Sequence, residues 1–249
     1  MVVICVIGCG TLGSRIAGEL CMCGHLVRVW DTDQYMLDRL PDQLNFEREQ
    51  ALEGGIIMTG VLGEVSVFTD LEEAVKEASI VIEAIVEDLE VKKEIMKKTS
   101  RLVDRSAVIM SSTLRLPLDE IFSGVIAPER SIGLRFLFPV YAIPEVEVTP
   151  WDYTDKDTVQ RVTHWLERMG KTAFLRSGPE PLILSEEERE LRWKDRALTV
   201  NQNRGLGGRV VKHLPSLAHR GNFAPPQDDE TKYNSYKTKS NPYVECIKV

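Results

Sequence analysis

Three glycines near the start of the chain have a spacing that could bring backbone amides close to a phosphate group. They belong to Gly8-Cys9-Gly10-Thr11-Leu12-Gly13, which matches G-x-G-x-x-G between an apolar run and a stretch with helical spacing. The first glycine permits a tight turn, the second lets a pyrophosphate approach the backbone, and the third lets the helix pack closely on the strand. The N terminus of that helix favours negative charge. We therefore predict that a dinucleotide is bound by Gly8, Gly10, Thr11, Leu12 and Gly13.

A carboxylate at the end of the next apolar run indicates which dinucleotide is bound. Asp31 directly follows Leu26 to Trp30, a position where an acidic side chain accepts hydrogen bonds from the adenosine ribose and repels a 2′-phosphate. Arg28 is nearby, but the alternation of side chains along a strand should direct it elsewhere. The pattern therefore predicts NAD rather than NADP. The alternative is a glycine turn without a ligand, beside a solvated aspartate.

The elements that must position these residues alternate between strands and helices. Apolar runs rich in β-branched residues predict strands that are covered on both faces, and helical periodicity predicts helices between them. This alternation is typical of α/β proteins, and we predict a Rossmann-type, doubly wound, mainly parallel sheet. The predicted strands are Val2–Ile7, Leu26–Trp30, Val65–Phe68, Ile80–Ile85, Ala107–Met110, Ser131–Phe136, Val146–Thr149 and Thr172–Leu175. The predicted helices are Ser14–Met22, Gln34–Leu52, Leu71–Ala78, Leu89–Leu102, Pro117–Phe122 and Thr154–Met169, the last closed by Gly170.

The composition changes after about Leu184, which predicts a boundary between a nucleotide-binding domain at 1–184 and a tail at 185–249. Residues Ser185 to Arg196 are highly charged and could form a short exposed helix. From Asn201 onward the chain is rich in Gly, Asn, Pro, Lys and Asp. Such a composition buries too little apolar surface to offset the entropy of ordering. We therefore predict a largely irregular, mostly disordered C-terminal tail.

Composition and charge narrow the classes of partner. The 249 residues carry a formal net charge of -7 and 43% of them are apolar. A core of ordinary size is therefore expected, whereas a nucleic-acid partner is not, because phosphate binding needs a basic face. No run reaches the roughly 18 apolar residues of a membrane span, and no signal peptide is expected. The chain has five cysteines, an odd number that cannot all pair with one another, and none has zinc-ligand spacing with histidines. We therefore expect free thiols and no metal. Free thiols are in turn typical of a cytoplasmic location.

Several strings of residues, in order along the chain, resemble one family. They are Gly8 to Gly13, the run Val81 to Lys93, Ser111-Ser112-Thr113, and Arg130 to Pro139 followed by Val146-Glu147-Val148. Together they resemble the NAD-binding domain of 3-hydroxyacyl-CoA dehydrogenases. Residues Tyr141 to Pro150 are similar to the lambda-crystallin branch, which has gulonate dehydrogenase activity. The resemblance implies an oxidoreductase of fatty acid metabolism with NAD as its cofactor.

The same resemblance assigns two further cofactor contacts. Glu87 and Lys92 match the acidic residue and the lysine that lie beside the nicotinamide half of NAD in the family. The alternative for Lys92 is a solvated helix residue. The alternative for Glu87 is a helix N-cap or a first-turn charge, which the helix dipole favours in any case.

The residues expected to do the chemistry depart from the family pattern. In the family a histidine removes the proton from the substrate hydroxyl and a glutamate orients that histidine. Here Glu147 occupies the place of the glutamate, but Arg135 stands at the histidine position. An arginine stays protonated and cannot act as a base. In addition, Leu114 replaces a serine that contacts substrate and cofactor, and Phe138 replaces an asparagine beside the nicotinamide.

Other parts of the chain offer no replacement for the lost base. His25 follows the first helix at its capping turn and is expected to be structural, and His164 is expected to face solvent on its helix. His213 and His219 lie in the tail. Residues 185–249 show no trace of the helical domain that closes the substrate cleft and forms the dimer in the family. A truncated or alternatively spliced product would have this pattern.

Three functions remain compatible with the sequence. The first is an NAD(H)-binding pseudoenzyme with weak or no dehydrogenase activity. The second is an active oxidoreductase on a 3-hydroxyacyl-CoA or a sugar acid such as gulonate, with Arg135 clamping a substrate carboxylate or phosphate. The third is an interaction protein whose tail recruits a protein partner. The expected partners are accordingly a small-molecule substrate or none, and no nucleic acid or membrane.

Overall fold

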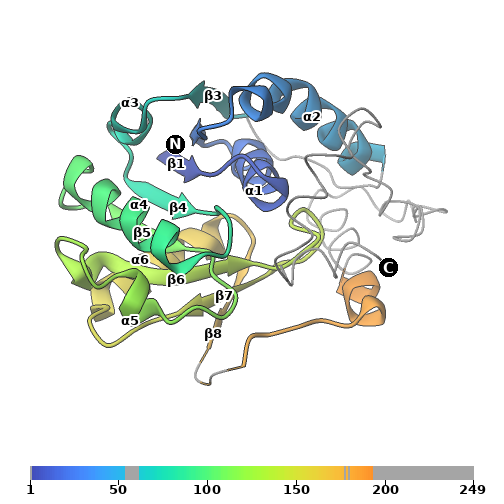
Figure 1. The fold of residues 1–249 in the computed structure, drawn as a ribbon. Coiled ribbons are helices and arrows are strands. Elements are labelled where there is room, and N and C mark those ends of the chain that lie inside the picture. The colour runs from blue at the N-terminus through green and yellow to red at the C-terminus, as the bar shows by residue number, and fades with distance from the viewer. Residues whose placement is uncertain (1, 54–61, 177, 179, 193–249) are drawn as a thin grey trace. The chain divides into compact units, whose positions relative to one another are not determined.

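The structure contains one eight-stranded sheet with the strand order β3-β2-β1-β4-β5-β6-β7-β8 (Figure 1). It is a computed structural model that describes residues 2–53, 62–176, 178 and 180–192. All pairings are parallel except that of β6 with β7. The predicted Rossmann-type, mainly parallel sheet is therefore confirmed. The strands are β1 (Val3–Ile7), β2 (Leu26–Trp30), β3 (Glu64–Phe68), β4 (Ile80–Glu83), β5 (Val108–Ser111), β6 (Ser131–Phe136), β7 (Glu145–Thr149) and β8 (Thr172–Leu175).

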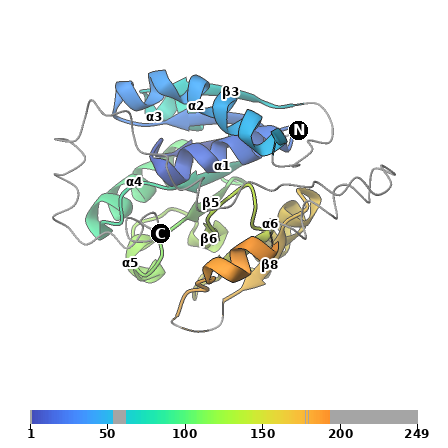
Figure 2. The same cartoon turned by 90° about the vertical axis from the view of Figure 1, so that its right-hand side faces the viewer.

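Helices cover both faces of this sheet. Ile4 and Val6 of β1 contribute to a core with α1, α2 and α6, whereas Cys5 and Ile7 contribute to a second core with α3, α4 and α5. Alternate residues of one strand thus enter opposite cores, which explains why the central strands are apolar throughout. Figure 2 brings the side with α1 and α2 toward the viewer. The helices are α1 (Thr11–Met22), α2 (Gln34–Glu53), α3 (Leu71–Val75), α4 (Leu89–Leu102), α5 (Leu118–Ile121), the 3-10 helix η1 (Pro128–Arg130) and α6 (Lys156–Arg168).

Capping residues account for the helix ends that differ from the prediction. Helix α6 begins at Lys156 because the Asp155 carboxylate accepts the backbone N–H of Thr158 at 2.6 Å. It ends at Arg168, one residue before the predicted end, and Gly170, which has φ +72°, follows as the predicted C-terminal cap. Helix α3 is shorter than predicted and ends at Val75, shortly before Glu77, whose φ is +64°.

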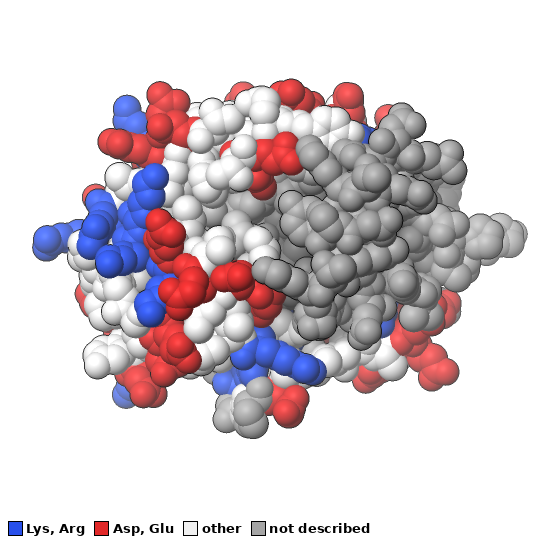
Figure 3. All heavy atoms as spheres, viewed as in Figure 1, with Lys and Arg blue, Asp and Glu red and all other residues white. Residues whose placement is uncertain are grey.

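The surface in the view of Figure 3 carries charges of both signs. Lysine and arginine side chains gather on its left, over α4, where Lys97, Lys98 and Arg101 are exposed. Within the described ranges no helix is long and apolar enough to cross a membrane.

The first part of the predicted tail lies within the described residues. Residues 186–192 are helical, as expected from their charged sequence, and Ser185 caps this helix because its hydroxyl accepts the N–H of Glu188 at 3.2 Å. The Glu188 carboxylate accepts the N–H of Ser185 in return, at 2.8 Å. The interpretation of residues 193–249 as disordered falls outside the described part of the chain, and so do His213, His219 and Cys246.

Candidate functional site

The glycine turn connects β1 to α1 and leaves the start of the helix open. Gly8 has φ +105°, and a Cβ placed on it would lie 2.8 Å from the carbonyl oxygen of Ala84. A Cβ on Gly13 would lie 1.9 Å from the carbonyl oxygen of Gly8. Among the described residues, a Cβ on Gly10 would meet no atom within 4 Å, and no side chain caps this end of α1. The unpaired N–H groups at the helix start therefore face open space in which an anion can bind.

Asp31 lies directly beside this turn, immediately after β2. Its Oδ2 accepts the backbone N–H of Cys9 at 2.6 Å, and its Oδ1 accepts the N–H of Asp33 at 2.9 Å. The carboxylate is thereby fixed next to the glycine turn, as the sequence predicts. Burial, together with the charges of Asp31 and Asp33, raises the pKa of the Cys9 thiol to about 12. Cys9 therefore stays protonated, and we assign it no reactive role.

Arg28 points away from the glycine turn, as expected from strand alternation. Its Nε donates to the carbonyl oxygen of Ala74 at 3.0 Å and its Nη2 to that of Glu73 at 2.6 Å. Its guanidinium lies 4.3 Å from the centroid of the Phe68 ring. With Arg28 engaged by α3, the carboxylate of Asp31 dominates the charge at the end of β2.

The strand order identifies where a ligand of the glycine turn would extend. The chain runs from β1 outward through β2 to β3 on one side, and through β4 to β5 on the other. In open parallel sheets a ligand binds outside the carboxyl ends of the strands where the order reverses in this way. Here that point lies between Gly8, after β1, and the turn that follows β4.

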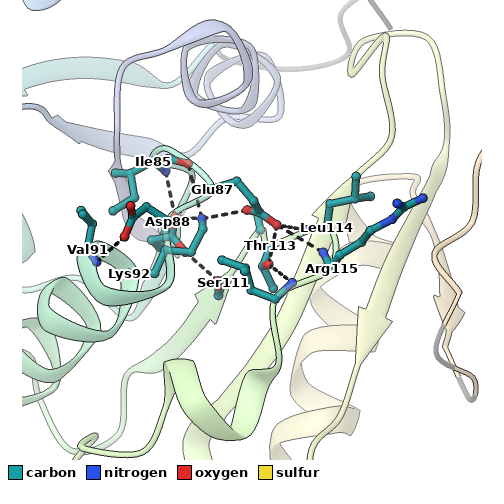
Figure 4. A network of polar contacts seen from close by, with 12 residues as sticks. Ile85, Glu87, Asp88, Val91, Lys92, Ser111, Thr113, Leu114 and Arg115 are labelled. Atoms are coloured by element: carbon teal, nitrogen blue, oxygen red, sulfur yellow. Dashed lines mark hydrogen bonds and ion pairs between the residues drawn. The ribbon is translucent and has the colours of Figure 1, made fainter. Parts of the chain in front are cut away.

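A buried charged cluster lies under the turn between β4 and α4 (Figure 4). The Nζ of Lys92 lies 2.5 Å from Oε1 of Glu83 and 3.5 Å from Oε2 of Glu87. Lys92 is only 1% exposed, so its interpretation as a solvated helix residue is wrong. Oε2 of Glu83 accepts the hydroxyl of Ser111 at 2.6 Å. The sequence analysis did not single out Glu83 or Ser111, although a glutamate in an otherwise apolar strand was a signal that could have been used.

Glu87 connects this turn to the segment after β5. Its Oε1 accepts the hydroxyl of Thr113 at 2.7 Å and the backbone N–H of Leu114 at 2.7 Å (Figure 4). The interpretation of Glu87 as a helix N-cap is wrong, because Asp88 caps α4 by accepting the N–H groups of Glu90 and Val91. Oε2 of Glu87 is buried and accepts no hydrogen bond from the described residues.

Arg135 and Glu147 face each other across the antiparallel strands β6 and β7. The Nη2 of Arg135 lies 2.8 Å from Oε2 of Glu147, and both side chains are buried. Oε2 also accepts the backbone N–H of Leu182 at 2.7 Å, and Oε1 lies 3.3 Å from Nη1 of Arg176. The carbonyl oxygen of Leu182 accepts Nη2 of Arg135 at 2.6 Å. Both oxygens of Glu147 are thus occupied by groups of this chain, and Leu182 bonds to both members of the pair.

Of the two other substituted positions, Leu114 contacts this group and Phe138 contacts α1. Leu114 is buried, and its carbonyl oxygen accepts Nη1 of Arg176 at 3.4 Å. Phe138 lies under Arg15 of α1, with 5.3 Å between the guanidinium carbon and the ring centroid. Neither side chain offers a proton acceptor for substrate chemistry.

Residues 3–176 match the family model described as the 3-hydroxyacyl-CoA dehydrogenase, NAD binding domain. The chain belongs to the 3-hydroxyacyl-CoA dehydrogenase family. It is 35% identical over 174 residues to a probable 3-hydroxybutyryl-CoA dehydrogenase of Bacillus subtilis, in an alignment that covers 68% of this chain and 60% of the relative. The chain therefore spans about three fifths of the length of that relative.

Solved structures of the 3-hydroxyacyl-CoA dehydrogenase family have the same fold. A 3-hydroxyacyl-CoA dehydrogenase from Archaeoglobus fulgidus matches with a TM-score of 0.61 and 26% identity, covering 84% of this chain and 66% of that one. A 3-hydroxybutyryl-CoA dehydrogenase from Escherichia coli matches with a TM-score of 0.64 and 25% identity, covering 70% of this chain and 38% of that one. The predicted family and NAD as the cofactor are confirmed.

The residues of this family member fit the cofactor. The open space at Gly10 leaves room for a pyrophosphate at the start of α1, and Asp31 supplies an acid for the adenosine ribose. On the far side of the strand-order reversal, Oε2 of Glu87 is a buried oxygen without a hydrogen-bond donor among the described residues. The residues that would hold NAD are thus spread over the ends of β1, β2 and β4.

His25 and His164 lie away from the residues that would hold NAD. His25 is buried against Trp165 with ring centroids 6.3 Å apart, and burial lowers the pKa of its imidazole. The side chain of His164 is 72% exposed, as expected. Cys5, Cys9, Cys21 and Cys23 are free thiols. Across the part of the chain that is described, no group of His, Cys, Asp or Glu could hold a metal ion.

Helix α1 also carries charged side chains that are buried against distant segments. Oε1 of Glu19 lies 2.7 Å from Nζ of Lys171, just before β8, and the two side chains are 1% and 0% exposed. Nη2 of Arg15, also on α1, lies 3.7 Å from Oε1 of Glu47 on α2, and Oε2 of Glu47 accepts the hydroxyl of Tyr141 at 2.6 Å. Burial and the charge of Glu47 raise the pKa of Tyr141 well above its usual value. These contacts fix α1, and the glycine turn before it, against the loops around β6 to β8.

Proposed function

We propose that this chain binds NAD(H) through the glycine turn and Asp31 and has weak or no 3-hydroxyacyl-CoA dehydrogenase activity. The observation that carries the proposal is the buried pair of Arg135 and Glu147, in which a permanent cation stands where the family has its base. Bound NAD supplies a hydride acceptor or donor. The protein must then move the proton of the substrate hydroxyl, and an arginine cannot accept it.

The environment of Glu147 supports the same conclusion. Its carboxylate is 1% exposed and is held by Arg135, Arg176 and the N–H of Leu182. Both carboxylate oxygens are thus already engaged by groups of this chain. Glu147 is therefore not expected to replace the missing base. Losing a general base lowers a rate by about 10²–10⁴-fold.

The alternative is an active oxidoreductase in which Arg135 clamps an acidic substrate, such as a sugar acid. The Nε of Arg135 is buried and has no hydrogen-bond partner among the described residues, so it is one donor that such a ligand could use. Its Nη2, however, is already shared by Glu147 and the carbonyl oxygen of Leu182. This arrangement favours the first proposal, because a clamp would need to displace a buried ion pair.

Cofactor binding and turnover should separate these proposals. We expect NAD to bind with saturation in a titration followed by tryptophan fluorescence, since Trp30 ends β2 immediately before Asp31. With NADH and acetoacetyl-CoA, we expect turnover at least about 100-fold below that of the Bacillus relative measured in parallel. Equal turnover of the two proteins would refute the loss of activity, and the same assay with gulonate and NAD would test the alternative.

Replacing Asp31 by serine is expected to weaken NAD binding by roughly 10–100-fold, because charge-assisted hydrogen bonds to the ribose are lost. Discrimination against NADP should fall at the same time, since no carboxylate then repels a 2′-phosphate. Isothermal titration with both cofactors measures this change. Asp33→Ser is the matched control, because among the described groups the Asp33 carboxylate accepts only the nearby N–H of Tyr35. If the two variants bind NAD equally well, Asp31 has no role in cofactor binding.

A further inference from the structure

The cluster of Glu83, Lys92 and Glu87 contains more negative than positive charge. Glu83 and Lys92 are 0% and 1% exposed, and the side chain of Glu87 is 11% exposed. Two carboxylates share one ammonium group, which leaves one net negative charge in a region that water screens poorly. Such a charge acts on any ligand group bound nearby.

Glu83 is the residue that creates this imbalance. Its Oε1 accepts both Nζ of Lys92 at 2.5 Å and the N–H of Ile85 at 2.8 Å. The Nζ of Lys92 lies closer to Glu83 than to Glu87, which is 3.5 Å away. Lys92 is therefore largely neutralised by Glu83, and the carboxylate of Glu87 is left only partly compensated.

The cluster lies next to the glycine turn, on the side away from Asp31. The N–H of Ala84 donates to the carbonyl oxygen of Ile7 at 2.8 Å, and a Cβ on Gly8 would lie 2.8 Å from the carbonyl oxygen of Ala84. Since Asp31 marks the adenosine side, the second half of the dinucleotide extends toward the ends of β4 and β5. There it meets the turn that carries Glu87.

We propose that Glu83 is a positioning residue of the cofactor site, which acts through Lys92 to keep this region negative and so favours NAD⁺ over NADH. The nicotinamide ring carries a positive charge when oxidised and none when reduced. An uncompensated carboxylate therefore stabilises the oxidised form selectively. The inference depends on the proposed placement of Glu87 and Lys92 beside the nicotinamide half.

The test compares the dissociation constants of NAD⁺ and NADH for the full chain by isothermal titration. In Glu83→Gln one charge is removed and Lys92 can compensate Glu87. We expect the Kd of NAD⁺ to rise about fivefold to tenfold while that of NADH changes little, the usual scale for one unit charge acting over several ångströms of protein. A loosened site would weaken both cofactors equally, so the ratio of the two constants is the decisive readout.

Two controls separate charge from structure. Ser111→Ala removes the hydrogen bond to Oε2 of Glu83 without a change of charge, and it should leave the ratio unchanged. Glu90→Gln removes a charge from the exposed side of α4, where screening by salt should also leave the ratio unchanged.

Each outcome bears on one of the two proposals. If Glu83→Gln fails to fold by circular dichroism, Glu87→Gln removes the same charge from a less buried position and should give the same shift in the ratio. An unchanged ratio in the folded variant overturns the role of Glu83 but leaves NAD binding intact. If the unmodified chain binds neither form of the cofactor, the proposed function itself fails and this inference fails with it.

Discussion

Replacing Gly13 by alanine is expected to abolish measurable NAD binding and to lower the free energy of unfolding by about 2–3 kcal/mol. The added Cβ would lie 1.9 Å from the carbonyl oxygen of Gly8, which belongs to the backbone and cannot rotate away. Alanine is the better helix former by about 1 kcal/mol, but the clash outweighs this gain. The turn between β1 and α1 must therefore open, and the N–H groups at the start of α1 lose their arrangement.

Gly10→Ala is the matched comparison for this variant. A Cβ on Gly10 meets no atom of the described part of the chain within 4 Å, so the free energy of unfolding should change by less than about 1 kcal/mol. NAD binding should nevertheless weaken, because the new methyl group occupies the space left for the pyrophosphate. Urea unfolding and NAD titration of both variants measure the two effects separately. Normal NAD binding by both variants would contradict the assignment of this turn to the cofactor.

Replacing Arg135 by histidine is expected to raise the rate of NADH consumption with acetoacetyl-CoA by about 100-fold or more. A general acid or base contributes about 10²–10⁴ to such rates, and in this reduction the imidazolium would donate the proton to the keto oxygen. The register of β6 and β7 places residue 135 directly opposite Glu147, so the carboxylate can orient an imidazole there. The fold should tolerate the change, because Glu147 keeps Arg176 and the N–H of Leu182 as partners. The rate should stay below that of a full-length relative, since Leu114 and Phe138 remain.

Arg135→Gln is the control for this gain of activity. It removes the same cation without adding a base, so no increase in rate is expected. The pH profile adds a second readout, because in this reduction the imidazolium must donate the proton to the keto oxygen, so only the histidine variant should lose activity as the pH rises through the imidazole pKa. A similar rate increase in both variants would mean that the cation itself, rather than the missing base, suppresses turnover.

The sequence predicts the sheet and the cofactor end of the site because both depend on local patterns. Runs of β-branched residues identify all eight strands, and Asp31 follows β2 at the position that a ribose contact requires. Gly170 closes α6 as expected, since a glycine with positive φ is a local feature of helix ends. The prediction that Arg28 turns away from Asp31 follows from strand alternation alone.

The buried ion pairs could not be predicted in the same way. The contact of Lys92 with Glu83 depends on how α4 packs against the end of β4, which helical periodicity does not specify. Leu182 bonds to Arg135 and Glu147 through its backbone, so the identity of its side chain carries no signal. The capping of α4 by Asp88 rather than Glu87 depends on a shift of one residue, which lies within the ordinary uncertainty of helix boundaries.

The ion pair of Glu19 with Lys171 connects the start of the fold to its last strand. Breaking a buried pair is costly, because each charge would be left without compensation, so α1 and the segment entering β8 should unfold together. Since NAD binds the folded glycine turn, its binding energy also stabilises β8 through this pair. Amide hydrogen exchange in Thr172–Leu175 should therefore slow when the dinucleotide binds at the other end of the sequence.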